Sequence, residues 1–144
     1  MQKALSLRVS ILLFVISFTF GCGGQVTVDS AQSSQVSYDE ALTLVNSGSY
    51  AQALPLLNKA IESGGLSADI YADALLLRSR CYCDAGDLEK GEADLSHAEQ
   101  GTPNPAQFEI AKGTLLFKKG KKAEADAAFK AAKKIDKSAV IPKL

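Results

Sequence analysis

The sequence has no tryptophan, one histidine and three cysteines among its 144 residues. It shows no cluster of histidine, cysteine and acidic residues with metal-ligand spacing, no carboxylate pair placed for acid–base chemistry and no glycine-rich phosphate loop. Its formal net charge is zero, which argues against a nucleic acid as the partner of the chain. These absences predict a protein that is not an enzyme, has no small-molecule substrate and needs no cofactor or metal.

The residues that are present favour helices. Hydrophobic residues make up 47% of the chain and charged residues 22%, which is ordinary for a globular protein, and the length leaves room for one domain. Ten phenylalanine and tyrosine residues and many alanines suit closely packed helices better than a β-sandwich. The composition therefore predicts an all-α fold.

Two short groups of residues look reactive but have simpler interpretations. On a helix, residues two apart point about 200° away from each other, so Cys81 and Cys83 can neither form a disulfide nor chelate one metal ion. We expect both to be small buried hydrophobic residues. Neighbouring helical residues also diverge, so Ser96 cannot present its hydroxyl to His97, although Asp94 lies nearby in the sequence. We expect His97 to be a solvated surface residue.

The N-terminus has the pattern of an export signal. Lys3 and Arg8 make it positive, and residues 9–20 are uncharged and rich in Ile, Leu, Val and Phe. These twelve residues fall short of the roughly 20 needed to cross a bilayer. Residues 1–21 are therefore predicted to be a secretory signal peptide, with an uncleaved anchor as the alternative.

The end of this segment resembles a bacterial lipobox, in which a small residue precedes a cysteine that receives lipid. Gly21 and Cys22 match that pattern, whereas Thr19 and Phe20 depart from the usual leucine and small residue. The resemblance implies a lipoprotein anchored through Cys22 to the bacterial membrane, on the periplasmic or cell-envelope side. Ordinary signal-peptidase cleavage after Gly21 is the alternative.

A short polar segment follows the cysteine. Residues 22–35 contain Gly, Ser, Gln and Thr with few large apolar side chains, too little to form a core. They are predicted to be a flexible tether with an end-to-end distance of roughly 20 Å. The folded domain is accordingly expected over residues 36–144.

Three glycines mark a repeat in the rest of the chain. Gly86 and Gly120 are 34 residues apart, and Gly48 precedes Gly86 by 38, which is the same period with a four-residue insertion. The insertion falls naturally at residues 63–67, where a loop can lengthen at little cost. Each glycine stands between two amphipathic stretches, as expected at the C-terminal end of a helix.

The residues around the glycines repeat in the same register. The large apolar residue four positions before each glycine is Leu44, Tyr82 or Leu116, and the small residue three before that is Ala41, Ser79 or Gly113. The small–large–small sets after each glycine are Ala53-Leu57-Ala60, Gly91-Leu95-Ala98 and Ala125-Phe129-Ala132. Small side chains let helices cross closely, and large ones fill the space between hairpins. This pattern resembles the tetratricopeptide repeat (TPR) family.

The resemblance implies a short right-handed solenoid of about three helix-turn-helix hairpins. The repeats would cover about residues 36–66, 72–105 and 106–139, with helices near 38–47, 50–63, 68–85, 88–99, 105–119 and 122–135. The chain departs from the family at its tryptophan position, which holds Ser37, Leu75 and Glu109. Expected helix caps are Ser49 with Gln52, Asp87, and Asn104 with Gln107, whereas Lys121 is a poor cap.

In tetratricopeptide arrays the first helices of the hairpins line a groove that takes a peptide or a partner helix. Its lining here would be Tyr38, Val45, Asn46, Leu76, Arg80, Cys83, Asp84, Ile110, Thr114, Phe117 and Lys118. Tyr38, Leu76, Ile110 and Phe117 would be apolar anchors. Arg80 and Lys118 could bind a carboxylate. The alternative for each anchor is packing against a neighbouring helix.

The charge is divided between the two parts of the chain. Residues 22–111 carry a net charge of −9, and residues 112–144, with ten lysines, carry +7. Solvated helix faces explain such a division, and docking of an acidic partner or anionic lipid at the C-terminal end is the functional alternative. The function expected is a membrane-tethered protein-interaction module or assembly scaffold of the cell envelope. A self-associating structural subunit of an envelope complex is the alternative.

Overall fold

The computed structural model describes residues 28–101 and 104–144 of the chain. The predicted signal peptide, the predicted lipid-attachment residue Cys22 and the first part of the predicted tether lie outside these ranges. Within the described residues no helix is long and apolar enough to cross a membrane.

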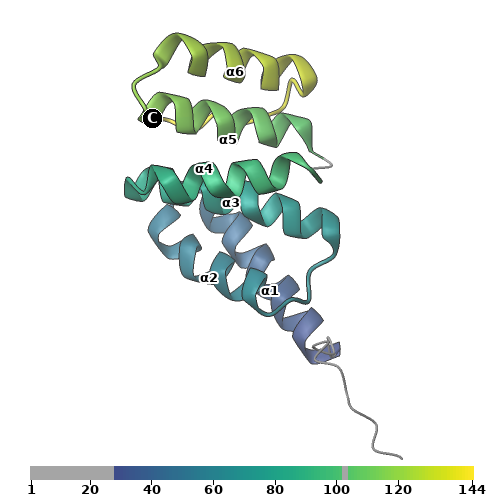
Figure 1. The fold of residues 1–144 in the computed structure, drawn as a ribbon. Helices are drawn as coiled ribbons and strands as arrows, with labels where there is room; N and C mark the ends of the chain where they lie inside the picture. The colour runs from purple at the N-terminus through teal and green to yellow at the C-terminus, as the bar shows by residue number, and fades with distance from the viewer. Residues whose placement is uncertain (1–27, 102–103) are drawn as a thin grey trace, which may run out of the picture.

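Every regular element in the described part of the chain is a helix, which confirms the all-α fold (Figure 1). The helices are α1 (Val28–Asn46), α2 (Tyr50–Glu62), α3 (Ala68–Ala85), α4 (Leu88–Glu99), α5 (Pro105–Lys118) and α6 (Lys122–Ile135). Figure 1 shows α1 and α2 at one end of the molecule, α5 and α6 at the other, and α3 and α4 between them. Apart from the start of α1, the helix ends agree with the expected ones to within one residue.

The same turn joins α1 to α2, α3 to α4 and α5 to α6. Gly48, Gly86 and Gly120 have φ angles of 80°, 85° and 79°, a left-handed conformation that glycine adopts without a steric penalty. Each glycine N–H donates to the carbonyl three residues earlier, and the next N–H donates to the carbonyl five residues earlier, at 2.8–3.3 Å. The three glycines therefore occupy equivalent positions, as their spacing predicted.

Small residues lie where the paired helices cross. Ala41, Ala53 and Ala60 are fully buried between α1 and α2, and the small residues at the matched positions of the other two hairpins are buried as well. Among the large residues that follow the glycines, Leu57 and Leu95 are buried and Phe129 is half-buried. In the second hairpin a Cβ on Gly91 would lie 2.9 Å from the sulfur of Cys83, and in the third a Cβ on Gly113 would lie 2.5 Å from the Phe129 ring. The crossings thus require small side chains.

The hairpins are packed together mainly through α3 and α5. Helix α3 contacts α1 and α2 on one side and α4 and α5 on the other, while α5 also contacts α4 and α6. Buried side chains of α3 accordingly belong to two core clusters, Leu77 and Cys81 facing α1 and α2, and Leu75 and Cys83 facing α4 and α5. Helix α3 is the centre of the fold.

The first helix begins at Val28, so the prediction of a flexible tether is wrong over residues 28–35. Ser34 is fully buried there, and its hydroxyl donates to the carbonyl of Ser30 at 2.8 Å and accepts from the N–H of Gly65 at 3.3 Å. A Cβ on Gly65 would lie 2.5 Å from the Cα of Ala31, so the inserted loop rests directly on the first turns of α1. The serines of this segment suggested a polar linker. A serine whose hydroxyl donates to a carbonyl of its own helix can, however, be buried.

Two of the expected caps form and one does not. The side chains of Asp87 and Asn104 accept from the N–H groups of Lys90 and Gln107, at 3.3 and 3.2 Å. The side chain of Ser49 makes no capping bond, and neither does that of Lys121. At the end of the last helix, 52% of Ile135 is exposed.

The C-terminal segment folds back along the last hairpin. Ala139 is 5% exposed and packs with Ile110 of α5 and Ala132 of α6, and Ile141 covers the same cluster. Figure 1 shows this segment running from the end of α6 back past α5. It covers apolar side chains of α5 and α6.

Candidate binding surfaces

Three of the four predicted groove anchors are core residues. Tyr38 is 9% exposed, Leu76 1% and Ile110 0%. Tyr38 packs with α2 and α3, Leu76 with the cluster shared by α4 and α5, and Ile110 under the C-terminal segment. The prediction that these side chains are presented to a partner is therefore wrong, because neighbouring helices and the chain's own tail already cover them.

The remaining predicted residues divide between core and surface. Val45, Cys83 and Thr114 are buried, and the Thr114 hydroxyl donates to the carbonyl of Ile110 at 2.9 Å. Phe117 is half-buried. Asn46, Asp84 and Lys118 are exposed, and the Lys118 ammonium lies 3.4 Å from the Asp84 carboxylate, so the two side chains bridge α3 and α5.

Arg80 is buried without a carboxylate partner. It is 5% exposed, and its only hydrogen bond among the described residues runs from Nη2 to the hydroxyl of Tyr50 at 3.5 Å. Its guanidinium also lies 5.8 Å from the centre of the Tyr50 ring. Its Nε is buried with no hydrogen-bond partner, and it makes no ion pair with any described residue. No described residue compensates the positive charge of Arg80 with an ion pair.

A second incompletely paired group lies near the start of α3. The Oδ1 atom of Asp73 is buried without a hydrogen-bond partner among the described residues. Burial raises the pKa of Asp73, and the nearby charge of Asp69 raises it further. Burial, followed by the charges of Asp73 and Asp39, raises the pKa of Tyr38 to about 12.

Sequence reasoning missed the polar network on the other side of α3. Arg78 makes two hydrogen bonds to the carboxylate of Asp94 on α4, from Nε at 2.7 Å and from Nη2 at 2.8 Å. Its Nη1 donates to the side chain of Asn58 on α2 at 3.1 Å. The bond to Asp94 raises the pKa of Arg78. The network joins α2, α3 and α4. The sequence pointed to it only through Asp94, an acidic residue within a helix that the structure shows to be buried.

The two reactive-looking groups behave as expected. Cys81 and Cys83 are both buried and unpaired, and burial raises their pKa values to about 12 and about 11, which keeps them as thiols. Since Cys83 is fully buried, it is not open to an oxidant from the predicted groove. Ser96 and His97 are exposed on α4, whereas Asp94 points inward to Arg78. In the described part of the chain no three residues are grouped as metal ligands.

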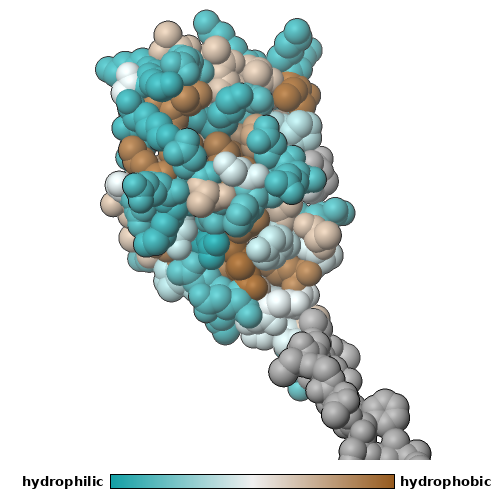
Figure 2. All heavy atoms as spheres, viewed as in Figure 1, coloured by the Kyte–Doolittle hydropathy of each residue, from teal (hydrophilic) through white to brown (hydrophobic). Residues whose placement is uncertain are grey.

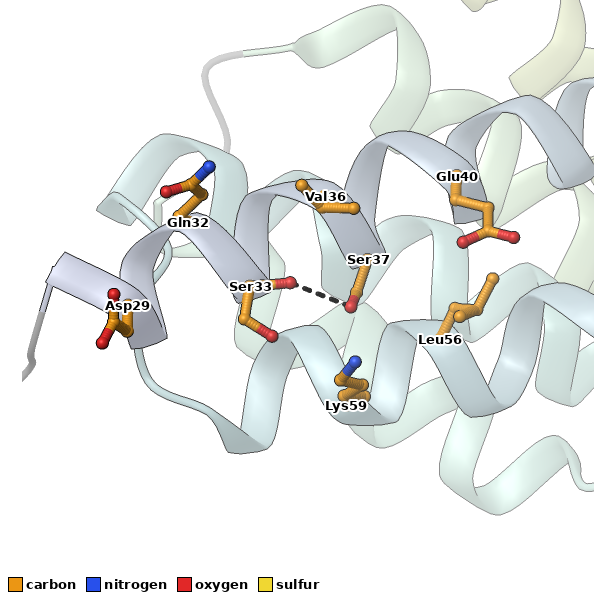
Figure 3. A pocket seen from close by; sticks show the side chains of 8 residues that line it. All are labelled: Asp29, Gln32, Ser33, Val36, Ser37, Glu40, Leu56 and Lys59. Carbon is orange, nitrogen blue, oxygen red and sulfur yellow. Dashed lines mark hydrogen bonds between the residues drawn. The ribbon is translucent and has the colours of Figure 1, made fainter.

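Two shallow hollows lie between helices. One, of about 350 Å³, lies between α1 and α2, where Ser33 and Ser37 face Lys59 and Leu56 (Figure 3). The Ser37 hydroxyl donates to the carbonyl of Ser33 at 2.9 Å, so it is already paired. The other, of about 290 Å³, lies between α4 and α5, and the ion pair of Lys119 and Glu92, at 2.8 Å, lies along its wall.

Comparison of the chain with family models, with curated proteins and with solved structures finds no match in any of the three. The relation to tetratricopeptide repeats therefore rests on the repeated residues and turns of this chain.

Proposed function

We propose that this protein is a membrane-tethered protein-interaction module of the bacterial cell envelope, built as a short solenoid of three tetratricopeptide-like hairpins. Two features support the repeat. The turns at Gly48, Gly86 and Gly120 have the same conformation and the same pair of hydrogen bonds. The small residues matched by the 34-residue period are buried at the crossing of each helix pair. Export and lipidation are proposed on the N-terminal pattern that ends in Cys22.

Arg80 is the observation that carries the proposed binding role. Burying a guanidinium without a counter-charge is costly, so a sequence under selection for stability alone would replace it by an apolar residue. A carboxylate supplied by a partner would complete the missing charge pair, and Arg binds carboxylates through two parallel hydrogen bonds. Arg80 also lies on the face of α3 that the repeat register assigned to the groove. We infer that the partner contributes an acidic side chain or a chain terminus at this position.

The burial of the other anchors narrows the proposed contact surface. With Tyr38, Leu76 and Ile110 in the core, the exposed or half-buried residues of the predicted groove are Asn46, Asp84, Phe117 and Lys118, and Arg80 itself is 5% exposed. The ion pair of Lys118 with Asp84 is exposed, so it can exchange for a partner's charge at little cost. Half-buried Phe117 supplies the apolar contact. The proposed ligand is therefore an acidic peptide or helix with one apolar side chain.

The test is capture of partners from envelope extracts by the wild-type protein, Arg80→Met, Phe117→Ala and a control, Lys90→Gln. Lys90 is exposed on α4, where its ammonium lies 2.7 Å from the Asp87 carboxylate and 5.5 Å from the centre of the Tyr82 ring, so its substitution removes a positive charge outside the proposed surface. We expect the same proteins with wild type and control, and their loss with the other two variants. If both variants retain the captured proteins, the proposed groove is wrong.

A captured partner allows a sharper measurement. Peptides covering its sequence are titrated against wild type and Arg80→Met by fluorescence anisotropy, each with its acidic residues present or replaced by amides. An Arg80–carboxylate contact predicts that removing the acidic group weakens binding to wild type by roughly tenfold or more and leaves binding to Arg80→Met unchanged. Equal losses in both proteins would place the carboxylate elsewhere.

The charge division favours one other function, a self-associating subunit. Residues 22–111 carry −9 and residues 112–144 carry +7, so the acidic part of one copy and the basic part of another are complementary. Sedimentation equilibrium at low and high salt tests this. Concentration-dependent association that disappears with salt supports the subunit, and a monomer at all concentrations excludes it.

A further inference from the structure

The last helix and the tail form a patch of unpaired lysines. Lys130, Lys133, Lys134, Lys137 and Lys143 are all exposed, and none of them makes an ion pair with a described residue. Four of the five lie within eight residues at the end of α6, where only Asp136 offsets them. The Asp136 side chain is itself bonded to the N–H and hydroxyl of Ser138. We call these five residues the lysine patch.

Exposed apolar side chains accompany the lysine patch. Three of the five large hydrophobic residues that are exposed in the described chain are Ile135, Val140 and Leu144, at 52%, 75% and 45%. Val140 is exposed because the tail alternates: Ala139 and Ile141 pack inward on the last hairpin, which turns the side chain between them outward. Figure 2 shows hydrophobic side chains set among hydrophilic ones over the end of the molecule that holds α5 and α6.

We propose that the lysine patch docks on the anionic lipid surface of a bilayer. Lysines that form no ion pair are attracted by anionic headgroups, and the hydrogen bond from the Lys133 ammonium to the Lys137 carbonyl, at 3.3 Å, leaves its charge in place. Neighbouring apolar side chains can enter the boundary between headgroups and acyl chains. The two hollows described above are lined by residues up to Lys121 only, and the lysines of the patch are all exposed, which suits contact with the surface of a bilayer. An acidic protein is the competing occupant.

The docking rests on the proposed function in one respect, the lipid on Cys22. That lipid would hold the bilayer close to the domain, so even weak attraction of the patch would be effective. Helices α1 and α6 lie at opposite ends of the molecule (Figure 1). If the lipid anchors the α1 end and the lysine patch binds the bilayer at the α6 end, the solenoid would lie along the membrane and would not project from it.

The absence of tryptophan makes a direct test possible. In the full chain, Ile135→Trp places a single indole directly after Lys134 in the sequence, at a residue that is 52% exposed. Tyr71→Trp, at a position 42% exposed near the start of α3, serves as the reference. Both proteins are mixed with vesicles of pure phosphatidylcholine and with vesicles containing phosphatidylglycerol. We expect a blue shift and quenching by lipid-borne quenchers for Ile135→Trp on the anionic vesicles, and no shift for Tyr71→Trp.

A matched pair of charge variants separates the patch from net charge. Lys130→Gln/Lys133→Gln/Lys134→Gln, made in Ile135→Trp, should weaken the response to anionic vesicles by about a hundredfold in lipid concentration. Lys59→Gln/Lys90→Gln/Lys112→Gln removes the same charge elsewhere and should leave the response unchanged. Circular dichroism confirms that both variants fold.

Three results would overturn the inference. They are an unchanged Ile135→Trp spectrum on anionic vesicles, equal shifts at both tryptophan positions, and equal losses in the two charge variants. A shift with polyglutamate and none with vesicles would do the same and assign the patch to an acidic protein. None of these results depends on Arg80, so partner capture by wild type and its loss in Arg80→Met would still stand.

Discussion

The two sides of α3 differ in whether their arginine has an acidic partner. Toward α4, Arg78 donates two hydrogen bonds to the Asp94 carboxylate and one to the side-chain oxygen of Asn58 on α2, and the Ser79 hydroxyl donates to the Gly91 carbonyl at 2.6 Å. On the side that carries Arg80 and Asp73, the Nε of Arg80 and the Oδ1 of Asp73 are buried with no partner among the described residues. The two arginines are two residues apart on one helix.

The difference separates residues that hold the fold from residues that are available for binding. A fully paired buried ion pair is costly to break but does nothing for a ligand. A buried charge with no partner weakens the free protein and can be compensated when a ligand supplies the opposite charge. Mutations on the two sides of α3 should therefore differ in sign as well as in size.

The largest expected effect is that of Arg78→Met. It leaves the Asp94 carboxylate, whose side chain is 8% exposed, without its partner, and breaking a buried pair in this way costs about 3–5 kcal/mol. Urea unfolding followed by circular dichroism at 222 nm should show a lower midpoint with an unchanged slope. The double variant Arg78→Met/Asp94→Leu should recover most of the loss. If it is as unstable as Arg78→Met, the loss comes from packing and not from an unpaired charge.

The next effect is a dependence of stability on alkaline pH. Tyr38 has a pKa of about 12 in the folded chain against 10.0 in the unfolded chain, so both states keep the proton below pH 10. As pH rises from 10 to 12, the unfolded chain releases it first, and the free energy of unfolding falls, by about 1 kcal/mol at pH 11. Unfolding curves at pH 9 and pH 11 for wild type and Tyr38→Phe measure this, with the cysteines common to both proteins. An equal fall in Tyr38→Phe would assign the dependence to other groups.

Arg80→Met should have a smaller effect and the opposite sign. Replacing an uncompensated buried guanidinium by an apolar side chain of similar length should raise the free energy of unfolding by about 1 kcal/mol. Thermal unfolding compares it with Arg80→Lys, which keeps the charge and should not be stabilised. A clear destabilisation by Arg80→Met would mean that Arg80 is a packing residue, and the two sides of α3 would then be alike.

The smallest effect is expected at the exposed pair of Asp84 and Lys118. Its ammonium–carboxylate distance is 3.4 Å, and both side chains reach solvent, so Lys118→Gln should cost no more than about 0.5 kcal/mol. The same substitution should weaken partner binding measurably if Lys118 belongs to the proposed surface. Unfolding and anisotropy titrations on one protein sample separate the two contributions. A stability loss above 1 kcal/mol would show that the pair holds α3 to α5.

The repeat could be read from the sequence because its signals are local. A glycine in the left-handed conformation, a large residue four positions earlier and small residues at fixed distances leave a pattern that needs no tertiary information. Gly48, Gly86 and Gly120 show the expected geometry for that reason. Asp87 and Asn104 cap their helices because each side-chain oxygen accepts from the N–H three residues later, within a single turn.

The features that sequence reasoning missed depend on distant segments. The first turns of α1 are ordered by contact with Gly65, more than thirty residues away, so a serine-rich stretch looked like a linker. The Arg78–Asp94 pair joins two helices, and nothing in either helix alone announces it. The groove anchors were assigned from the register of the 34-residue repeat, which gives the direction of a side chain but does not show which other segment covers it. Ile110, for example, is covered by the C-terminal tail.

The turn at each hairpin also limits where the chain can change length. One residue after each glycine completes the hydrogen bonding of one helix and is also the N-cap of the next; these residues are Ser49, Asp87 and Lys121. A deletion or an insertion at these turns would therefore disrupt a helix end. The loop between α2 and α3 is pinned by the close approach of Gly65 to Ala31. In the connection from Glu99 to Pro105, the Gly101 N–H donates to the Ala98 carbonyl at the end of α4, and Asn104 caps α5, so the two tasks fall on different residues. An epitope inserted by design should therefore be tolerated better at that connection than at the three glycine turns.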